Sequence, residues 1–298
     1  MDNSSPLRDR TVVVTGAARG IGEETARELV RRGARVALLG LEEERLERLA
    51  ADLPPGSARP WPVDVADEEA LTRAAAEIRG RWGAPSVVVA NAGVAAGGPF
   101  AASDPQSWRR IVEANLVGSV LTARCFLPDL LATRGYHLQV ASLAALAPSP
   151  MLAAYSATKA GAEAFARSLG AEVAHRGVRV GVAYLSWTDT GMIRAADRTA
   201  ALRLVRSRLP WPATRTHEPA AVARRLVDGM ERRASSVYAP AWLRAVMVSR
   251  GLLPPLITQG ARWRLSRSRV AGELEGTGLL GPGGEAYEAR RGERHSDG

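Results

Sequence analysis

A β-branched run that ends in a glycine-rich turn constrains this fold more than any other stretch. The run is residues 10–15 (RTVVVT), and the turn, residues 16–22 (GAARGIG), leads into a helical pattern that continues to Arg32. A continuous apolar run of this length is typical of a buried parallel strand. Glycines between a strand and a helix let backbone N–H groups approach a pyrophosphate at the helix N-terminus. The spacing is G-x-x-x-G-x-G, and a plain tight turn remains the alternative for this element alone.

Short apolar runs and helical patterns go on alternating along the chain. Because parallel strands need crossover connections, the alternation predicts an α/β fold: a Rossmann-like, doubly wound parallel sheet of about seven strands, flanked by helices on both faces. Residues 1–240 are expected to form one domain, and residues 241–298 a C-terminal extension. Further strands are predicted at residues 35–39, 61–65, 86–90, 136–142, 178–185 and 237–239.

Composition is that of an ordinary globular protein, with 46% hydrophobic and 24% charged residues among 298. The single cysteine, Cys125, allows no intrachain disulfide and suggests a reducing compartment. The first ten residues lack the apolar run of a signal peptide. We therefore expect a cytoplasmic location.

The chain is strongly basic, with a formal net charge of +9 and a pI near 10.7. Such a charge is compatible with a nucleic-acid or anionic-membrane partner. The arginines are dispersed, however, and mostly interleaved with Glu and Asp on helical patterns. The sequence shows no zinc ligand set and no aromatic RNA-binding motif, so we expect no nucleic-acid partner and no metal site.

Residues 142–159 (SLAALAPSPMLAAYSATK) carry the chemistry. Tyr155 and Lys159 are four residues apart, so they share one face of a helix. An ammonium near a phenol favours phenolate, so the pKa of Tyr155 is expected to lie below its ordinary value near 10. Ser142, at the end of a strand, can hydrogen-bond the same oxygen atom that the phenol serves. The set predicts acid/base chemistry on a carbonyl or an alcohol.

Lys159 is the only lysine in the chain, and all other residues of the 40 Lys+Arg are arginines. Lysine differs from arginine where a compact ammonium with an adjustable pKa is needed. A leftover surface lysine is the alternative.

The end of the second predicted strand bears on the choice of coenzyme. An adenosine ribose usually meets the residue after this strand, which here is Gly40, followed by Leu41. Neither is acidic, so nothing there repels a 2′-phosphate, and Arg19 in the glycine turn could pair with that group. We therefore expect NADP(H) to be favoured, with NAD(H) possible.

Three further sites fit a bound dinucleotide. Asp64-Val65 ends the third strand, and the Asp64 carboxylate can accept a hydrogen bond from an adenine amino group. Asn91-Ala92-Gly93 follows the fourth and leaves room for a coenzyme across the strand end. Asn115 lies inside a helical region, where asparagine is mildly unfavourable, so it is expected to kink the helix or hold a water. A solvent-facing asparagine is the alternative.

Together these motifs resemble the short-chain dehydrogenase/reductase family, in its single-domain form with a C-terminal extension. Residues 15–22 match the family's TGxxxGIG, and Asn115, Ser142, Tyr155 and Lys159 match its catalytic tetrad. The resemblance implies that Tyr155 is the proton donor in reduction or the base in oxidation, and that Ser142 holds the substrate oxygen. It implies that Lys159 lowers the tyrosine's pKa and binds the nicotinamide ribose, and that Asn115 keeps a kink and anchors a water. The implied coenzyme contacts are Gly16, Ala18, Arg19, Gly20, Ile21, Gly22, Gly40, Asp64, Val65, Asn91, Ala92, Gly93, Tyr155, Lys159, Thr188 and Thr190.

One segment departs from the family pattern. Leu185-Ser186 stands where the family usually has Pro-Gly, although Thr188 and Thr190 still offer hydroxyls to the nicotinamide carboxamide. Residues 187–218 are expected to cover the substrate, and their apolar side chains suggest a hydrophobic one. A surface helix pair with its own small core is an equal alternative.

The extension has two parts. Residues 242–257 are apolar, and Arg262, Arg264, Arg267 and Arg269 follow, a combination that can lie on an anionic membrane. We favour the other interpretation, a segment folded over the substrate cleft or a subunit interface. Residues 272–298 are rich in Gly, Glu and Arg and are predicted to be mobile.

The sequence thus predicts an NADP(H)-dependent oxidoreductase that interconverts a ketone and a secondary alcohol on a hydrophobic small molecule. The alternative is a non-catalytic dinucleotide-binding sensor or scaffold, because fold alone does not determine function. The intact tetrad favours the enzyme. Residues 104–133 and 153–175 resemble the family's pairing surfaces, so a homodimer or homotetramer is expected.

Overall fold

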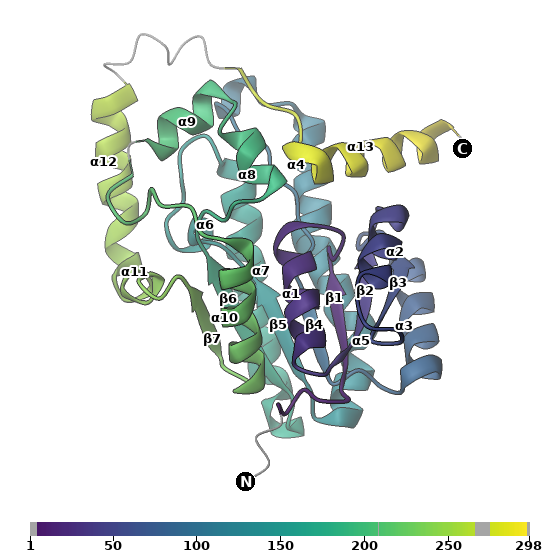
Figure 1. Ribbon diagram of the computed structural model, residues 1–298. Coiled ribbons are helices and arrows are strands. Elements are labelled where there is room, and N and C mark those ends of the chain that lie inside the picture. The colour runs from purple at the N-terminus through teal and green to yellow at the C-terminus, as the bar shows by residue number, and fades with distance from the viewer. Residues whose placement is uncertain (1–4, 208, 266–274, 297–298) are drawn as a thin grey trace.

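The computed structural model describes residues 5–207, 209–265 and 275–296 (Figure 1). A single seven-stranded sheet, parallel throughout, has the strand order β3-β2-β1-β4-β5-β6-β7. This architecture confirms the predicted doubly wound α/β fold. The strands are β1 (Thr11–Thr15), β2 (Arg35–Gly40), β3 (Ala58–Pro62), β4 (Val87–Ala90), β5 (Tyr136–Val140), β6 (Arg179–Leu185) and β7 (Ser236–Ala239).

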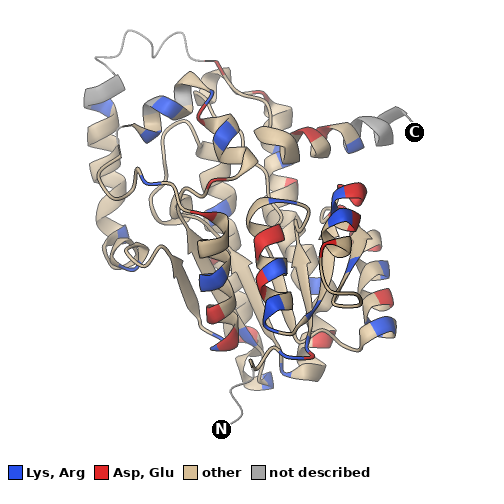
Figure 2. Cartoon of the chain, viewed as in Figure 1, with Lys and Arg blue, Asp and Glu red and all other residues tan. Residues whose placement is uncertain are grey.

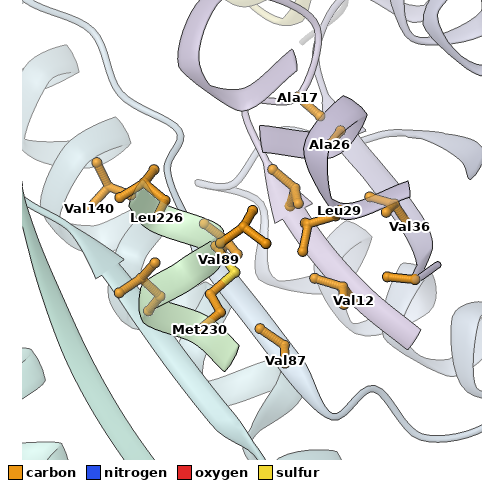
Figure 3. Close-up of a cluster of buried hydrophobic side chains, with 14 of the residues drawn as sticks. Val12, Ala17, Ala26, Leu29, Val36, Val87, Val89, Val140, Leu226 and Met230 are labelled. Carbon is orange, nitrogen blue, oxygen red and sulfur yellow. The ribbon is translucent and has the colours of Figure 1, made fainter. Parts of the chain in front are cut away.

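Helices cover both faces of the sheet because each buries one apolar stripe against the Val- and Leu-rich strands. Helices α1 (Gly20–Arg31), α2 (Glu43–Ala51) and α10 (Pro219–Glu231) share one core cluster. Helices α3 (Glu68–Trp82), α5 (Gly118–Thr133) and α7 (Ala153–Val173) pack on the opposite face. Figure 3 shows the first cluster, in which Ala26, Leu29, Leu226 and Met230 from α1 and α10 meet Val12, Val87, Val89 and Val140 of the central strands.

The strand order reverses between β1 and β4, which lie side by side although β4 is the third strand after β1 in sequence. In a doubly wound sheet the ligand crevice opens at such a point, beyond the carboxyl ends of the strands. The glycine turn after β1 and the Asn91-Ala92-Gly93 segment after β4 therefore meet at one edge.

The predicted helical region 104–133 is divided in two. Helix α4 (Pro105–Val112) and α5 are joined by a π-helical turn, Glu113–Val117, which contains Asn115. By length and composition alone this run could cross a membrane. Here it packs against the sheet through buried residues such as Phe126 and Leu130, as core helices of α/β domains do.

The third strand differs most from its predicted range, at both of its ends. The third strand was expected at residues 61–65, but β3 is Ala58–Pro62, and Asp64 and Val65 follow it. This strand lies at the edge of the sheet, where proline is tolerated because its missing N–H is not needed for pairing. Ala58, Arg59 and Pro60 therefore pair with β2, although they do not form an apolar run.

The C-terminal extension folds onto the same body. Helix α11 (Leu243–Ser249), the 3-10 turn η4 (Arg250–Leu252) and α12 (Leu253–Leu265) form a continuous run. Leu243 is fully buried, and Arg250 Nη1 lies 2.8 Å from the buried Glu163 carboxylate. The prediction of a mobile tail at residues 272–298 is wrong for residues 275–296, which include helix α13 (Gly281–Ser296). Residues 272–274 and 297–298 lie outside the described part of the chain.

Candidate active site

A cavity of about 870 Å³ runs along the edge where the strands end. All the coenzyme contacts predicted from the sequence line it, and so does Ser142. Asn115 does not, because its side chain is fully buried behind the cavity wall.

The glycine turn owes its shape to positions that only glycine fits. Gly16 and Gly20 have φ of +64° and +57°, in the left-handed region that L side chains rarely adopt. A Cβ at Gly22 would collide with the carbonyl oxygen of Gly16. The turn therefore presents bare backbone to the cavity at the start of α1.

Asn91 holds the glycine turn against the end of β4. Its Nδ2 donates to the carbonyl oxygens of Thr15 and Gly16, at 2.9 and 3.3 Å. In return, Thr15 Oγ1 accepts from the backbone N–H groups of Asn91 and Ala92, at 3.0 and 3.1 Å. These four bonds fix the distance between the glycine turn and the segment that follows β4.

Asn115 holds the loop after β4 in place. Its Oδ1 accepts from Val94 N at 2.8 Å, and its Nδ2 donates to Val94 O at 2.9 Å and to Thr158 Oγ1 at 3.2 Å. The π turn that carries Asn115 agrees with the predicted kink, and the solvent-facing alternative is wrong because the residue is fully buried. The Asn115 carboxamide thus connects the α4–α5 junction to the loop after β4, which contains Val94, and to α7, which contains Thr158.

Ser142, Tyr155 and Lys159 come together where β5 ends and α7 begins. The Ser142 side chain lies close enough to Tyr155 to act on its pKa, and Ser142 Oγ accepts from Ala144 N at 3.2 Å. Lys159 Nζ lies 5.8 Å from the centroid of the Tyr155 ring and donates to Val140 O at 3.1 Å. The helical spacing thus brings ammonium and phenol onto one face, as the sequence predicts.

The expected lowering of the Tyr155 pKa is wrong for this arrangement. Burial raises the pKa of Tyr155, and the Ser142 side chain opposes the rise only in part. Burial also lowers the pKa of Lys159 to about 8. Both groups are buried on the same wall of the cavity, and desolvation is the main cause of both pKa shifts.

Glu42 is a site residue that the sequence reasoning missed. It lines the cavity two residues after Gly40, and its carboxylate forms an ion pair with Arg19, whose Nε donates at 2.7 Å. The expectation that no carboxylate stands near the end of β2 is therefore wrong. Glu42 is the N-cap residue of α2, and the turn between β2 and α2 directs its side chain back toward the glycine turn.

The predicted cover is present as α8 (Gly191–Ala196) and α9 (Ala200–Arg206). Thr190 caps α8 and faces Gly20, whose added Cβ would lie 3.0 Å from Thr190 Cγ2. Thr188 Oγ1 donates to Ser186 O at 3.0 Å, so this hydroxyl is partly engaged. The Arg206 guanidinium lies 5.3 Å from the centroid of the Trp187 ring, beside the catalytic residues.

A second missed group comes from the C-terminus. Leu280, Gly283, Ala286 and Tyr287 all line the cavity. The available signal was the Leu279-Leu280 pair and Tyr287 inside an otherwise polar segment, but neither shows where the segment docks.

The family description "short chain dehydrogenase" matches residues 10–201, most of the sheet and every catalytic position. The chain belongs to this family. Its members are oxidoreductases that act on CH–OH groups with NAD(P), so the predicted family and enzyme class are confirmed over the sensor alternative.

Individual relatives agree with this assignment. The chain is 34% identical over 189 residues to the probable oxidoreductase EphD of Mycobacterium tuberculosis, covering 62% of this chain but only 32% of that protein. It is 31% identical to carbonyl reductase family member 4 of Danio rerio, covering 74% and 91% of the two chains. It is 32% identical to meso-2,3-butanediol dehydrogenase of Serratia marcescens, covering 62% and 73%. The crystal structure of gox2181 shares the fold, with a TM-score of 0.72 at 24% identity, covering 78% and 95%.

The cavity of this short-chain dehydrogenase has residues that fit a dinucleotide coenzyme. The glycines of the turn, two of them with positive φ and a third, Gly22, with no room for a Cβ, leave backbone exposed for a pyrophosphate. The Asp64 side chain, 2% exposed, stands at the adenine end, and Lys159 stands at the catalytic end. These residues would hold the coenzyme, which supplies or accepts the hydride.

We predict that the Lys159 ammonium titrates with a midpoint near 8, because burial disfavours its charged form. Below that pH the group is charged, and above it neutral. With ¹³C/¹⁵N-lysine labelling, the single lysine gives a single side-chain signal, so NMR can follow the titration directly. Lys159→Arg should remove the signal, and a midpoint near the ordinary value of about 10.4 would contradict the prediction.

Proposed function

We propose that this enzyme interconverts a ketone and a secondary alcohol on a hydrophobic small molecule, with NADP(H) as coenzyme and Tyr155 as acid and base. The observation that carries the proposal is the group formed by Ser142, Tyr155 and Lys159, in which Lys159 Nζ lies 5.8 Å from the centroid of the Tyr155 ring. It stands on the wall of the cavity between the glycine turn and a region lined by apolar side chains.

The residues of the chain divide the proton chemistry between them. In reduction, the Tyr155 hydroxyl gives its proton to the substrate oxygen as the carbonyl carbon receives a hydride. Burial raises the pKa of Tyr155, so the phenol is a weaker acid than a free tyrosine and depends on its neighbours to give up the proton. In oxidation the same oxygen takes the proton, and the Lys159 ammonium stabilises the phenolate. Ser142 orients the substrate oxygen beside the phenol.

The substrate region is lined mostly by apolar side chains among the described residues. Trp187 and Met192 approach from the cover, and α11 and α12 close the far side with Val246, Leu253 and Ile257. Few polar groups beyond Tyr155 and Ser142 are available to bind a substrate, so the cavity favours one with a largely hydrocarbon body.

Arginines support the preference for a 2′-phosphate. Arg19 and Arg45 both approach Glu42, with Arg45 Nε 3.4 Å from its carboxylate. Arg290 Nη1 donates to Leu41 O at 3.2 Å, next to Glu42. Two guanidinium groups thus pair with Glu42 and a third binds the backbone next to it, so a 2′-phosphate here would meet Arg19 and Arg45 as well as the Glu42 carboxylate.

The apolar helix run supports peripheral membrane contact by an otherwise cytoplasmic protein. Val248 of α11, Leu252 of η4 and Leu256 of α12 are 85%, 67% and 62% exposed. Arg244 and Arg262 are exposed on the same run. In Figure 2 the described part of α12 is mostly uncharged. Arg267 and Arg269, part of the basic cluster noted in the sequence, lie outside the described residues.

The assembly is proposed to be a homodimer or homotetramer. Helices α5 and α7 leave outer residues such as Arg124 and Arg167 exposed, as surfaces available for pairing. Light scattering after gel filtration measures the mass directly, and a monomer at all concentrations would exclude this assembly.

We predict that Tyr155→Phe lowers turnover about 10²–10⁴-fold, because the proton donor is lost while the ring remains. Coenzyme affinity should stay within a few-fold of the unsubstituted protein. A panel of ketones and secondary alcohols, followed by reduced-nicotinamide absorbance, measures both the activity and its loss. Undiminished turnover in Tyr155→Phe would refute the acid/base assignment.

We predict that the protein binds NADPH more tightly than NADH, and that Arg19→Ala weakens NADPH binding about tenfold or more while changing NADH binding little. Arg48→Ala is a matched control, because Arg48 is exposed on α2 and pairs only loosely with Glu44 at 3.8 Å. Fluorescence titration with both coenzymes gives the comparison. A clear preference for NADH would overturn the proposed coenzyme.

We predict that the full chain floats with vesicles containing phosphatidylserine, and that replacing Val248, Leu252 and Leu256 together by serine abolishes flotation. Phe100→Ser is the control, because Phe100 is 72% exposed but lies on the separate turn Phe100–Ala102. If the unsubstituted chain stays unbound, the membrane proposal fails while the enzymatic one stands.

A further inference from the structure

The segment from Glu275 to Arg290, here called the C-terminal strap, crosses the coenzyme end of the cavity. It begins by pairing with the loop after β4: Thr277 N donates to Gly97 O, and Leu280 N to Ala95 O, both at 2.7 Å. Gly97 N donates to Thr277 Oγ1, also at 2.7 Å. The strap is therefore joined to the same loop that Asn91 and Asn115 hold in place.

Two adjacent leucines attach the strap to both ends of the site. Leu279, with Tyr287, packs in a cluster with Val94 and Ile111 on the coenzyme side. Leu280 packs in a different cluster, next to Tyr155 and the cover residue Met192. All three strap residues are at least 93% buried, with exposures of 7%, 6% and 3% for Leu279, Leu280 and Tyr287.

The strap then continues to the adenosine side. A Cβ on Gly281 would lie 2.8 Å from the carbonyl oxygen of Gly191, so the strap touches the start of α8. Gly283 lies against the Arg19 side chain, since an added Cβ would be 3.7 Å from Arg19 Cδ. Arg290 then reaches Leu41 O at the end of β2. Figure 1 shows α13 running from α8 across the strand ends toward α2.

We propose that the strap is the outer wall of the dinucleotide site and must detach before the coenzyme can enter or leave. The glycine turn, Asp64 and Asn91 form the inner wall of one cavity whose outer wall is Leu280, Gly283, Ala286 and Tyr287. A dinucleotide extended from Asp64 to Lys159 passes between the two. The inference rests on coenzyme binding by the family, and not on the proposed substrate or the NADP preference.

The ion pair between Arg110 and Glu288, 3.1 Å apart, offers a place to lock the strap to α4. In a Cys125→Ser background, Arg110→Cys and Glu288→Cys are joined by a bismaleimide with a reducible disulfide spacer. Stopped-flow nicotinamide fluorescence then follows binding of NADPH and, separately, of NADH. Each single-cysteine variant, treated in the same way, is the control for chemical modification.

The locked protein should bind either coenzyme at least tenfold more slowly than the same protein after reduction, and reduction should restore the rate. Coenzyme bound before cross-linking should be released more slowly by a similar factor. Equal rates before and after reduction would overturn the inference. Failure of both coenzymes to bind the reduced protein would overturn it together with the proposed function, whereas binding without any activity would affect only the proposed function.

A substitution in the strap gives an independent test. Tyr287→Ala should speed release of the bound reduced coenzyme about tenfold, with a matching rise in Kd. Tyr238→Ala is the control: it truncates a partly buried tyrosine of β7, stacked on Tyr184, and should leave release unchanged. Tighter coenzyme binding in Tyr287→Ala would show that the strap competes for the site and would overturn the inference, as would equal release from both variants.

Discussion

The bonds between Thr15 and Asn91 are the constraint on which the rest of the site depends. Parallel strands β1 and β4 end at the same edge of the sheet, but the chain then leaves in different directions. The loop after β1 leads into α1, and the loop after β4 leads to α4. Asn91 joins the two loops through both its backbone and its side chain. Because Gly22 has no room for a Cβ beside Gly16 and Asn91, the glycine turn cannot shift independently of this joint. The crevice therefore has a fixed width before any ligand is considered.

Local patterns predict much of this architecture because its determinants are local. A buried strand, a glycine turn and an amphipathic helix each depend on neighbours within a few residues, so the alternation predicts the sheet and the places where its strands end. The tetrad is predictable for a similar reason. Tyr155 and Lys159 share a helix face, and the ends of parallel strands converge, which brings Ser142 to them. The π turn at Asn115 follows from an amide that binds both backbone groups of Val94.

The electrostatics of the site could not be predicted in this way. Spacing shows that an ammonium lies near a phenol, and proximity alone lowers the pKa of the phenol. The opposite direction for Tyr155 arises from desolvation, which depends on what covers the pair. Those covering residues come from distant segments, including Leu152, Trp187 and Leu280. Glu42 was missed on similar grounds, because its position opposite Arg19 depends on how α2 leaves the sheet, not on a motif.

The C-terminus shows how far composition can mislead about order. Residues 272–298 have the glycine and charge content of a mobile tail, yet three apolar side chains are enough to dock residues 275–290, because each enters a cluster that other elements have already built. The extension thus serves both ends of the cavity, with α11 and α12 around the hydrophobic end and α13 over the coenzyme end. Residues 275–290 contact both the glycine turn and the substrate cover, so they connect the two ends of the site. Opening for the coenzyme then disturbs Leu280 beside Tyr155, so loading of the coenzyme and shaping of the catalytic pocket are physically one event.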